Sequence, residues 1–180
     1  MITFKKITLA AVVLGLSGAL PRAAYAHDRP APKPSSTEFN QVKQLAGKWS
    51  GTSTHPGTDE KPAPVNVEFE VTAAGSAIEE TLMQDTPHEM VDMYTDENGK
   101  LAMTHYCALG NQPHMVLKQA SPKSISLEMG PTIGIDPVKD QHMHSLALEF
   151  PDANHLTERW TSYKDGKAGE TVLFKLTRVP

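Results

Sequence analysis

The sequence predicts an all-β fold: a ten-stranded antiparallel up-and-down β-barrel with a short N-terminal helix. Between residues 46 and 180 the chain consists of short runs in which apolar and polar residues alternate, and turn-forming residues separate the runs. Closing hairpin-linked strands into a barrel removes the exposed edges that an open sheet would leave. The predicted strands are residues 48–54, 65–72, 76–83, 89–95, 100–107, 114–120, 124–129, 142–150, 155–163 and 171–179.

A short helix is predicted immediately before the first strand. Ser36 or Thr37 can cap its first turn, and Phe39, Val42 and Leu45 fall on one apolar stripe before a glycine ends the helix. We expect this stripe to pack on one end of the barrel.

The one-sided burial of a barrel strand is clearest in residues 65–72. Apolar residues occupy every second position from Val65 to Val71, and polar residues fill the positions between them. Val172 and Phe174 repeat this pattern near the C-terminus. Turn chemistry is evident in Asp-Glu-Asn-Gly at 96–99 and in Asp-Gly at 165–166, and longer loops are expected at 56–64 and 130–141.

The first 26 residues are predicted to be a cleavable signal peptide. Lys5 and Lys6 precede an apolar run at 7–20, and the segment from Ala24 to Ala26 is a small-x-small cleavage site. Cleavage after Ala26 implies a periplasmic or secreted protein. Residues 27–35 are rich in proline and charge and are predicted to form a disordered lead-in, so the barrel domain is expected at 36–180.

The net charge and the cysteine content limit the classes of binding partner that we expect. The net charge is −4 without a basic cluster, which argues against nucleic acid as a partner. The apolar run of the signal is too short to span a bilayer comfortably, so no stable membrane insertion is expected. Cys107 is the only cysteine, which rules out an intramolecular disulfide and leaves a buried thiol, a ligand or half of a dimer bridge. A small molecule or a metal ion is therefore the expected partner, and the oligomeric state is left open.

The segment from Leu45 to Thr52, Leu-Ala-Gly-Lys-Trp-Ser-Gly-Thr, resembles the start of calycin barrels, which include lipocalins, fatty-acid-binding proteins and bacterial lipocalin-like proteins. In these families a Gly-x-Trp opens the first strand and its indole closes one end of the barrel, and here Gly47 and Trp49 match. Residues 86–90 and 104–113 resemble uncharacterised secreted bacterial proteins of lipocalin-like type. The resemblance implies a barrel that can enclose a small ligand, without indicating a particular activity.

Four side chains with metal-ligand chemistry alternate with apolar residues on two predicted strands. His105 and Cys107 share one face of the strand at 100–107, and His142 and His144 share the face that carries leucines further along their strand. Same-face neighbours on a strand lie about 6–7 Å apart, which suits two ligands of one ion. Nitrogen and sulfur donors favour zinc or copper. Two alternatives stay open: a polar ligand pocket without a metal, and interior polar residues that hydrogen-bond one another and buried water.

Further residues are predicted to line the interior or its mouth. Two acids fall on inward positions, Met103 shares the face of His105, Trp160 can form a wall, and an Asn-Gln pair follows Cys107 in a turn. The predicted ligand-binding residues are Glu80, Met103, Asn111, Gln112, Glu158 and Trp160.

The functional hypothesis is an exported small-ligand or metal-binding protein with an interior His/Cys centre. The alternative is an enzyme in which a metal or Cys107 acts on a small molecule in the barrel, and a third reading is a purely structural module. The sequence contains no Gly-x-Ser-x-Gly, His-Glu-x-x-His or phosphate-binding glycine loop. Cys107 and His105 could act as nucleophile and base, but the sequence names no third orienting residue, and we assign no catalytic residue.

Overall fold

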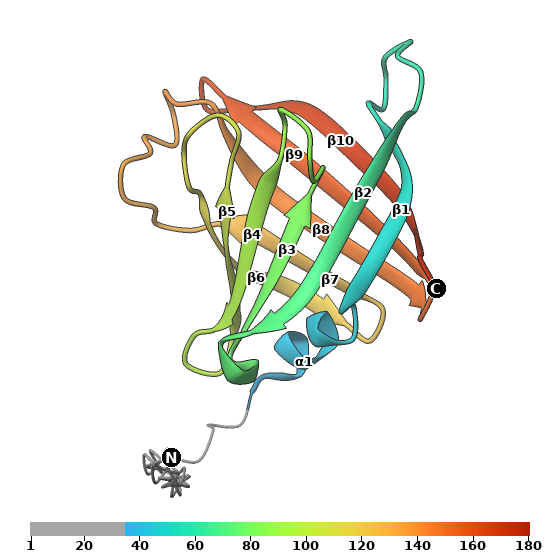
Figure 1. Ribbon diagram of the computed structural model, residues 1–180. Helices are drawn as coiled ribbons and strands as arrows, with labels where there is room; N and C mark the ends of the chain where they lie inside the picture. Colours follow the sequence, from blue (N-terminus) through green and yellow to red (C-terminus); the bar gives the residue numbers. More distant parts are fainter. Residues whose placement is uncertain (1–34) are drawn as a thin grey trace, which may run out of the picture. The chain divides into compact units, whose positions relative to one another are not determined.

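Ten antiparallel strands close into one barrel in the computed structural model, which describes residues 35–180 (Figure 1). Each strand pairs with its neighbours in sequence, and β1 pairs with β10 to complete the closure. The elements are α1 (Thr37–Lys43), β1 (Gly47–Thr54), β2 (Ala63–Thr72), η1 (Ala73–Gly75), β3 (Ala77–Leu82), β4 (Met90–Asp96), β5 (Leu101–Tyr106), β6 (His114–Ser121), β7 (Ser124–Met129), β8 (His142–Asp152), β9 (His155–Lys164) and β10 (Lys167–Arg178).

The predicted fold class is confirmed, because every predicted strand corresponds to one strand of the barrel and the single helix precedes β1. The largest difference is at the start of β10, which begins at Lys167 and not at residue 171. Lys167 pairs directly with Lys164, so the hairpin ladder runs up to the Asp-Gly turn. The predicted signal peptide, and the predicted lead-in apart from Ser35, lie outside the described residues.

Helix α1 lies at one end of the barrel (Figure 1). The Ser36 hydroxyl accepts a hydrogen bond from the Phe39 amide and caps the helix as predicted. Phe39 and Val42 are fully buried within the barrel core. The Ser36 amide also donates to a carboxylate oxygen of Asp96 at 2.6 Å, which ties the start of the helix to the end of β4. Within residues 35–180, no helix is long and apolar enough to cross a membrane.

Arg178 fastens the end of α1 to the barrel. Its guanidinium donates to the carbonyl oxygens of Gln44 and Ala46 at 2.8 and 2.7 Å, and it lies 4.3 Å from the centre of the Trp49 ring. The Trp49 indole N–H donates to the Leu45 carbonyl at 2.8 Å. The helix-end carbonyls, which have no partner within a helix, are satisfied in this way. Trp49, the helix and Arg178 together close this end of the barrel.

The up-and-down order places the remaining turns at two opposite ends. The connections β2–β3, β4–β5, β6–β7 and β8–β9 lie at the α1 end, and the connections β1–β2, β3–β4, β5–β6, β7–β8 and β9–β10 lie at the other end, which we call the rim. Cys107 begins the β5–β6 connection, so it lies at the rim. The Asn111 side-chain amide donates to the Gln141 carbonyl at 2.8 Å and joins this connection to the long β7–β8 loop.

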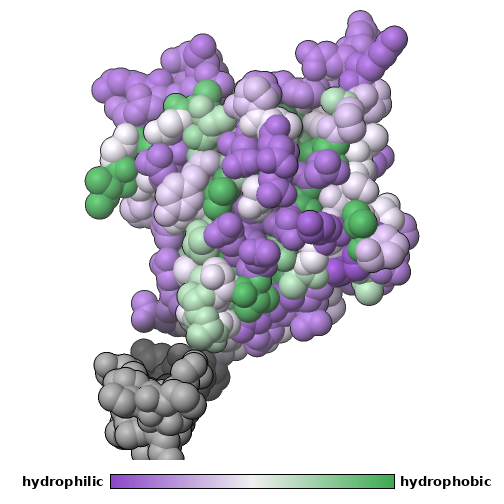
Figure 2. Space-filling model, in the orientation of Figure 1, coloured by the Kyte–Doolittle hydropathy of each residue, from purple (hydrophilic) through white to green (hydrophobic). Residues whose placement is uncertain are grey.

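Most inward-facing positions carry apolar side chains that pack into one core cluster, which runs from Phe39 in the helix to Leu176 in β10. The outer surface is largely hydrophilic on the side that Figure 2 shows, with apolar residues scattered over it. This division follows from the alternation of side chains along each strand.

Candidate functional site

Four ionisable side chains are fully buried inside the barrel. Glu80 on β3, Asp92 on β4, His105 on β5 and Glu158 on β9 are each 0% exposed. Strand register brings the first three together, because Glu80 lies opposite Asp92 and Asp92 lies opposite His105. Glu158 reaches the same region from β9, which is not a neighbour of β3 in the barrel. We call these four residues the acid–imidazole centre.

His105 and Asp92 form a buried ion pair. Their Nδ1 and Oδ1 atoms are 2.6 Å apart, and both side chains are almost completely excluded from solvent. Burial disfavours the imidazolium, but the attraction of the Asp92 carboxylate outweighs it and raises the pKa of His105 to about 10. His105 is therefore positively charged at neutral pH, and Asp92 holds its ring in place.

The two glutamates share the centre with a tyrosine and a tryptophan. The Tyr94 hydroxyl donates to Glu80 at 2.6 Å, and the Trp160 indole N–H donates to Glu158 at 3.1 Å. Glu80 and Glu158 are also within hydrogen-bonding reach of each other. Two ionised carboxylates cannot bond, since neither has a donor, so this contact requires a proton on one of them.

The pKa values of the glutamates show which of them holds the proton. Burial, followed by the charges of Glu158 and Asp92, raises the pKa of Glu80 well above its ordinary value. Burial also raises the pKa of Glu158 to about 7, while its contacts with Glu80 and Trp160 oppose the increase. Glu80 is therefore neutral at neutral pH, and Glu158 is close to its titration midpoint.

Each member of the centre also has one polar atom without a hydrogen-bond partner in the barrel. These atoms are Glu80 Oε1, Asp92 Oδ2, His105 Nε2 and Glu158 Oε1. The proton of Glu80 can be donated to Asp92 or to Glu158, which both lie within its reach, but not to both. At least one carboxylate oxygen and the Nε2–H of His105 therefore still need partners.

Cys107 extends the centre toward solvent. Its thiol is half-buried at the rim, near His105 and the backbone N–H of Leu109. Burial raises the pKa of the Cys107 thiol, but the nearby His105 and the Leu109 N–H outweigh burial and lower it. His105 Nδ1 is bonded to Asp92, and Nε2 has no hydrogen-bond partner, so no hydrogen bond joins the ring to the thiol.

His142 and His144 do not point into the barrel, which corrects the face predicted for them. The β8–β9 pairing shifts by one residue between Met143 and Ser145, so a β-bulge falls at His144. Before the bulge Met143 packs against the core, and after it Leu146 is the inward residue. His142 is paired with Tyr163, which follows Arg159 and Thr161 on the outward side of β9.

The two histidines instead interact with each other on the outer side of β8. His142 Nε2 is 3.2 Å from His144 Nδ1, and His142 Nδ1 is 2.8 Å from the Asp140 carbonyl. The His144 ring stacks on Tyr163 at 3.7 Å, and its Nε2 is 3.5 Å from a Glu128 oxygen. Burial and the neighbouring His142 lower the pKa of His144.

The four predicted metal ligands thus lie in two pairs, His105 with Cys107 and His142 with His144. Within residues 35–180, no group of three or more His, Cys, Asp or Glu side chains is arranged to hold a metal ion. Zinc or copper binding stays a prediction from donor chemistry.

The predicted ligand-binding residues are divided between the interior and the rim. Met103 and Trp160 are buried beside the centre, and the Trp160 ring lies 4.8 Å from that of His105. Asn111 and Gln112 lie in the β5–β6 connection, where Asn111 holds the β7–β8 loop and Gln112 donates to the Gly110 carbonyl at 3.2 Å. Direct contact of these two side chains with a ligand stays a prediction.

Asp92 and Tyr94 are the members of the site that the sequence analysis missed. On β4 the alternative face carries Val91 and Met93, which look at least as apolar. Counting back along the β4–β5 hairpin from the Asp-Glu-Asn-Gly turn would have found Asp92, because that register places it opposite His105.

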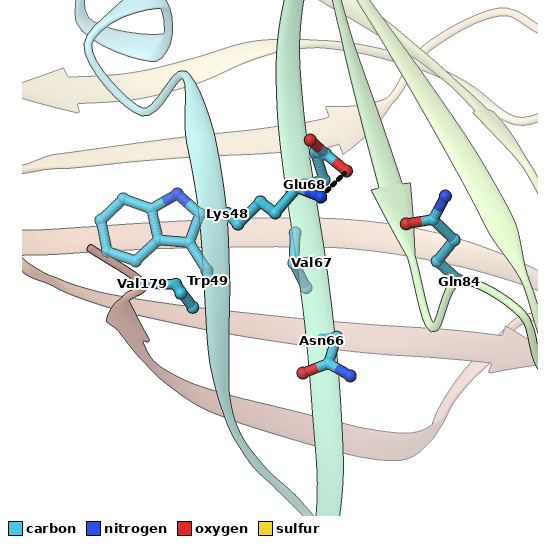
Figure 3. Close-up of a pocket in the computed structure, with 7 residues that line it drawn as sticks. All are labelled: Lys48, Trp49, Asn66, Val67, Glu68, Gln84 and Val179. Carbon is cyan, nitrogen blue, oxygen red and sulfur yellow. Dashed lines mark ion pairs between the residues drawn. The ribbon is translucent and has the colours of Figure 1, made fainter.

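Shallow hollows on the outer surface are chemically simpler than the centre. Figure 3 shows one of about 200 Å³ beside β1 and β2, where Lys48 and Glu68 form an ion pair at 3.7 Å and Asn66 and Gln84 lie nearby. Lys48, Asn66 and Glu68 are on the outward side of their strands, and the core residues Trp49 and Val67 also line this hollow. Its polar side chains are at least partly exposed to water and need no ligand.

The fold and the site together define a closed ten-stranded antiparallel barrel with a buried acid–imidazole centre. No family model matches the sequence, and no curated protein is significantly similar to it. Among solved structures, the chain is similar to Rv2717c from M. tuberculosis, with a TM-score of 0.54 and 12% identity over 82% of this chain and 100% of that one.

It is also similar to a protein of unknown function from the DUF3598 family of Nostoc punctiforme, with a TM-score of 0.52 and 12% identity over 77% of this chain. The match covers 49% of the Nostoc protein, so this chain spans about half of its length. At these identities the similarity shows a shared barrel fold alone. The likeness to calycins stays a resemblance.

Proposed function

We propose that this protein binds a small polar molecule inside its barrel, at the acid–imidazole centre. The observation that carries the proposal is the set of buried polar atoms from four strands that have no partner in the barrel. A buried polar atom without a partner typically costs about 1–3 kcal/mol. A guest that supplies the missing partners removes this cost, and the barrel then stabilises the guest in return.

The chemistry of the centre defines the guest. At least one carboxylate oxygen, of Asp92 or of Glu158, requires a hydrogen-bond donor, and Nε2–H of His105 requires an acceptor. With Glu80 neutral, the Asp92–His105 pair is balanced and Glu158 adds negative charge as it ionises. The guest is therefore a compact molecule, neutral or cationic, with at least one hydrogen-bond donor and at least one acceptor. Met103 and Trp160 supply apolar walls beside it.

Export forms the second part of the proposal, and the predicted signal peptide supports it. The mature chain would begin at His27 and carry its guest outside the cytoplasm. N-terminal mass analysis of the protein from its own host tests this part. A chain that still begins at Met1 in the extracytoplasmic fraction, or one found only in the cytoplasm, would contradict it.

Native mass spectrometry of the full protein from its own host tests the binding proposal. We expect a mass above that of the denatured chain in wild type, and loss of the extra mass in Glu80→Gln. Glutamine still accepts from Tyr94, but its amide has two N–H donors where a protonated carboxyl has one, so it can satisfy both neighbouring acids and leave no open carboxylate oxygen for the guest. Glu79→Gln is the matched control, because Glu79 is adjacent on β3 and lies on the outward face.

Two outcomes would overturn the proposal. One is an empty wild-type protein whose native and denatured masses agree; the other is an extra mass that Glu80→Gln retains while circular dichroism shows a folded barrel. Elemental analysis of the same samples reports any zinc or copper separately. A stoichiometric metal lost in His105→Gln would identify the guest as an ion.

A further inference from the structure

The buried charges inside the barrel do not balance. Glu80, Asp92 and Glu158 bring three carboxyl groups into the acid–imidazole centre, and His105 brings one imidazole. Within residues 35–180 no lysine or arginine is buried, and the other buried histidine lies on the outer side of β8. The imidazolium of His105 neutralises Asp92, to which it is bonded at 2.6 Å. Two carboxyl groups are therefore left without a positively charged partner among the described residues.

Each of these two carboxyl groups has one bonded oxygen and one open oxygen. Glu80 accepts from the Tyr94 hydroxyl at 2.6 Å, and Glu158 accepts from the Trp160 indole N–H at 3.1 Å. The Trp160 ring lies 4.8 Å from the His105 ring, so the Glu158 carboxyl group belongs to the same region as the ion pair. The second oxygen of each glutamate and Nε2 of His105 have no partner in the barrel.

Each of the two groups can be neutralised by a proton or by a cation, because a buried carboxylate without a counter-charge is strongly disfavoured. Glu80 holds a proton, since burial raises its pKa well above its ordinary value. Glu158 differs, because the hydrogen bond from Trp160 supports its ionised form. Glutamine at position 158 would accept the same hydrogen bond without a buried charge. A carboxyl group at this position is therefore suited to a guest that carries a positive charge.

We propose that the guest of the acid–imidazole centre is a small organic cation, whose N–H groups donate to the open oxygen of Glu158 and whose acceptor receives Nε2–H of His105. This inference rests on the proposed function, because it concerns the same site, and it selects a cation over a neutral molecule. With the guest bound, the charges of the centre sum to zero, since Glu80 is neutral and Asp92 is paired with His105. A hydrogen bond from a charged N–H to a carboxylate is about twice as strong as one between neutral groups.

An organic cation matches the centre better than a bare metal ion does. Within the described part of the chain, no three His, Cys, Asp or Glu side chains are arranged to hold a metal ion. The Nε2–H of His105 also needs an acceptor, which a bare ion does not supply. An organic molecule can carry a positively charged donor and an acceptor together.

The test compares two probes of equal size, 2-aminoethanol and ethylene glycol, at equal ionic strength. 2-Aminoethanol carries an ammonium group where ethylene glycol carries a hydroxyl, and the remaining hydroxyl of either probe can accept from His105. Binding to the dialysed full protein is followed by the indole N–H signals in a proton–nitrogen NMR spectrum. Trp160 reports on the centre, and Trp49, whose indole donates to the Leu45 carbonyl at the α1 end, is the internal control.

We expect 2-aminoethanol to shift the Trp160 signal until it saturates, and to bind at least about tenfold more tightly than ethylene glycol, while the Trp49 signal stays in place. Binding of 2-aminoethanol should weaken about tenfold from about pH 8 to about pH 6. The ionised fraction of Glu158 falls by this factor across a pKa of about 7, and its proton then competes with the guest. The probe itself stays protonated over this range, as a lysine side chain does.

Glu158→Gln should lose the shift that 2-aminoethanol causes, although glutamine still accepts from the Trp160 indole. Glu149→Gln is the matched control, because Glu149 is exposed on the outer side of β8. This control should bind the probe like wild type.

A Trp160 shift that is as large and as tight with ethylene glycol would overturn the inference and leave the proposed function intact, because the centre would then take a neutral guest. A Trp160 signal that neither probe moves would also overturn it, while the native mass of the protein from its own host would still decide the proposed function. A shift that folded Glu158→Gln retains would count against the inference in the same way. If this variant does not fold, the two probes and the pH dependence in wild type decide the question.

Discussion

Replacing Glu158 with glutamine should make the stability of the barrel less dependent on pH. Glu158 is fully buried, and burial raises its pKa in the folded protein from 4.5 to about 7. An acid whose pKa is higher in the folded than in the unfolded chain binds its proton more tightly in the fold. Its contribution to stability is therefore complete below about pH 4.5 and is lost as the pH rises to about 7.

The magnitude follows from this difference in pKa. The change from 4.5 to about 7, at about 1.4 kcal/mol for each pH unit, corresponds to a loss of ~3 kcal/mol. Glutamine has nearly the same shape, still accepts from the Trp160 indole and has no proton to lose. The unfolding free energy of the variant should therefore not fall in this way as the pH rises. Some dependence on pH should remain, because burial raises the pKa of Glu80 in the same direction.

Urea unfolding of wild type and Glu158→Gln, followed by circular dichroism between about pH 4 and pH 8, measures the effect. We expect the difference in unfolding free energy to move by ~3 kcal/mol in favour of the variant between about pH 4.5 and pH 7. Glu149→Gln on the exposed side of β8 is the control and should follow wild type. A difference between wild type and Glu158→Gln that stays constant within about 1 kcal/mol over this range would refute the reasoning.

Three further predictions concern the ion pair and the closure of the barrel. The ring of His105 should stay protonated on both nitrogens up to about pH 10 in an NMR titration. In Asp92→Asn the main attraction that opposes burial is lost, so the pKa of His105 should fall, and an unchanged transition in the variant would contradict this. Arg178→Lys should lower the unfolding free energy by about 1–3 kcal/mol, because lysine cannot bind both helix-end carbonyls while covering Trp49. An equally stable variant would show that these contacts of Arg178 do not stabilise the barrel. Gly51→Ala should lower the unfolding free energy by about 3 kcal/mol or more in the same urea assay, because the added Cβ would lie 1.9 Å from a β10 carbonyl oxygen. A mild effect would mean that β1 and β10 can move apart easily.

The barrel could be predicted from the sequence because its signal is local and repeated. Alternation along residues 65–72 identifies a strand and its inner face without reference to any other part of the chain. The Asp-Glu-Asn-Gly and Asp-Gly turns fix where strands reverse. Closure of the sheet into a barrel was predicted because an open sheet would leave two exposed edges, and the pairing of β1 with β10 confirms it.

The candidate site was only partly predictable, because alternation gives a face but not a register. Glu80, His105 and Glu158 lie inside as their alternation indicates. Asp92 was missed because it competes with a more apolar face on its own strand, and only the pairing with His105 decides between the two. His144 was misplaced because a β-bulge exchanges the inner and outer faces, and the sequence around it carries no glycine or proline to mark the bulge.

The acid–imidazole centre is unusual because its acids lower the stability of the barrel that holds them. A barrel that served only as a scaffold would be more stable with apolar side chains of similar volume at these positions, since a buried charged network is often no better than hydrophobic packing. Here burial is the largest cause that raises the pKa of both glutamates, which means that the fold resists their ionised forms. The same four strands also direct polar atoms at one another without completing their hydrogen bonds. A local cost of this kind, set inside an otherwise consistent apolar core, is expected where a protein has a function to perform.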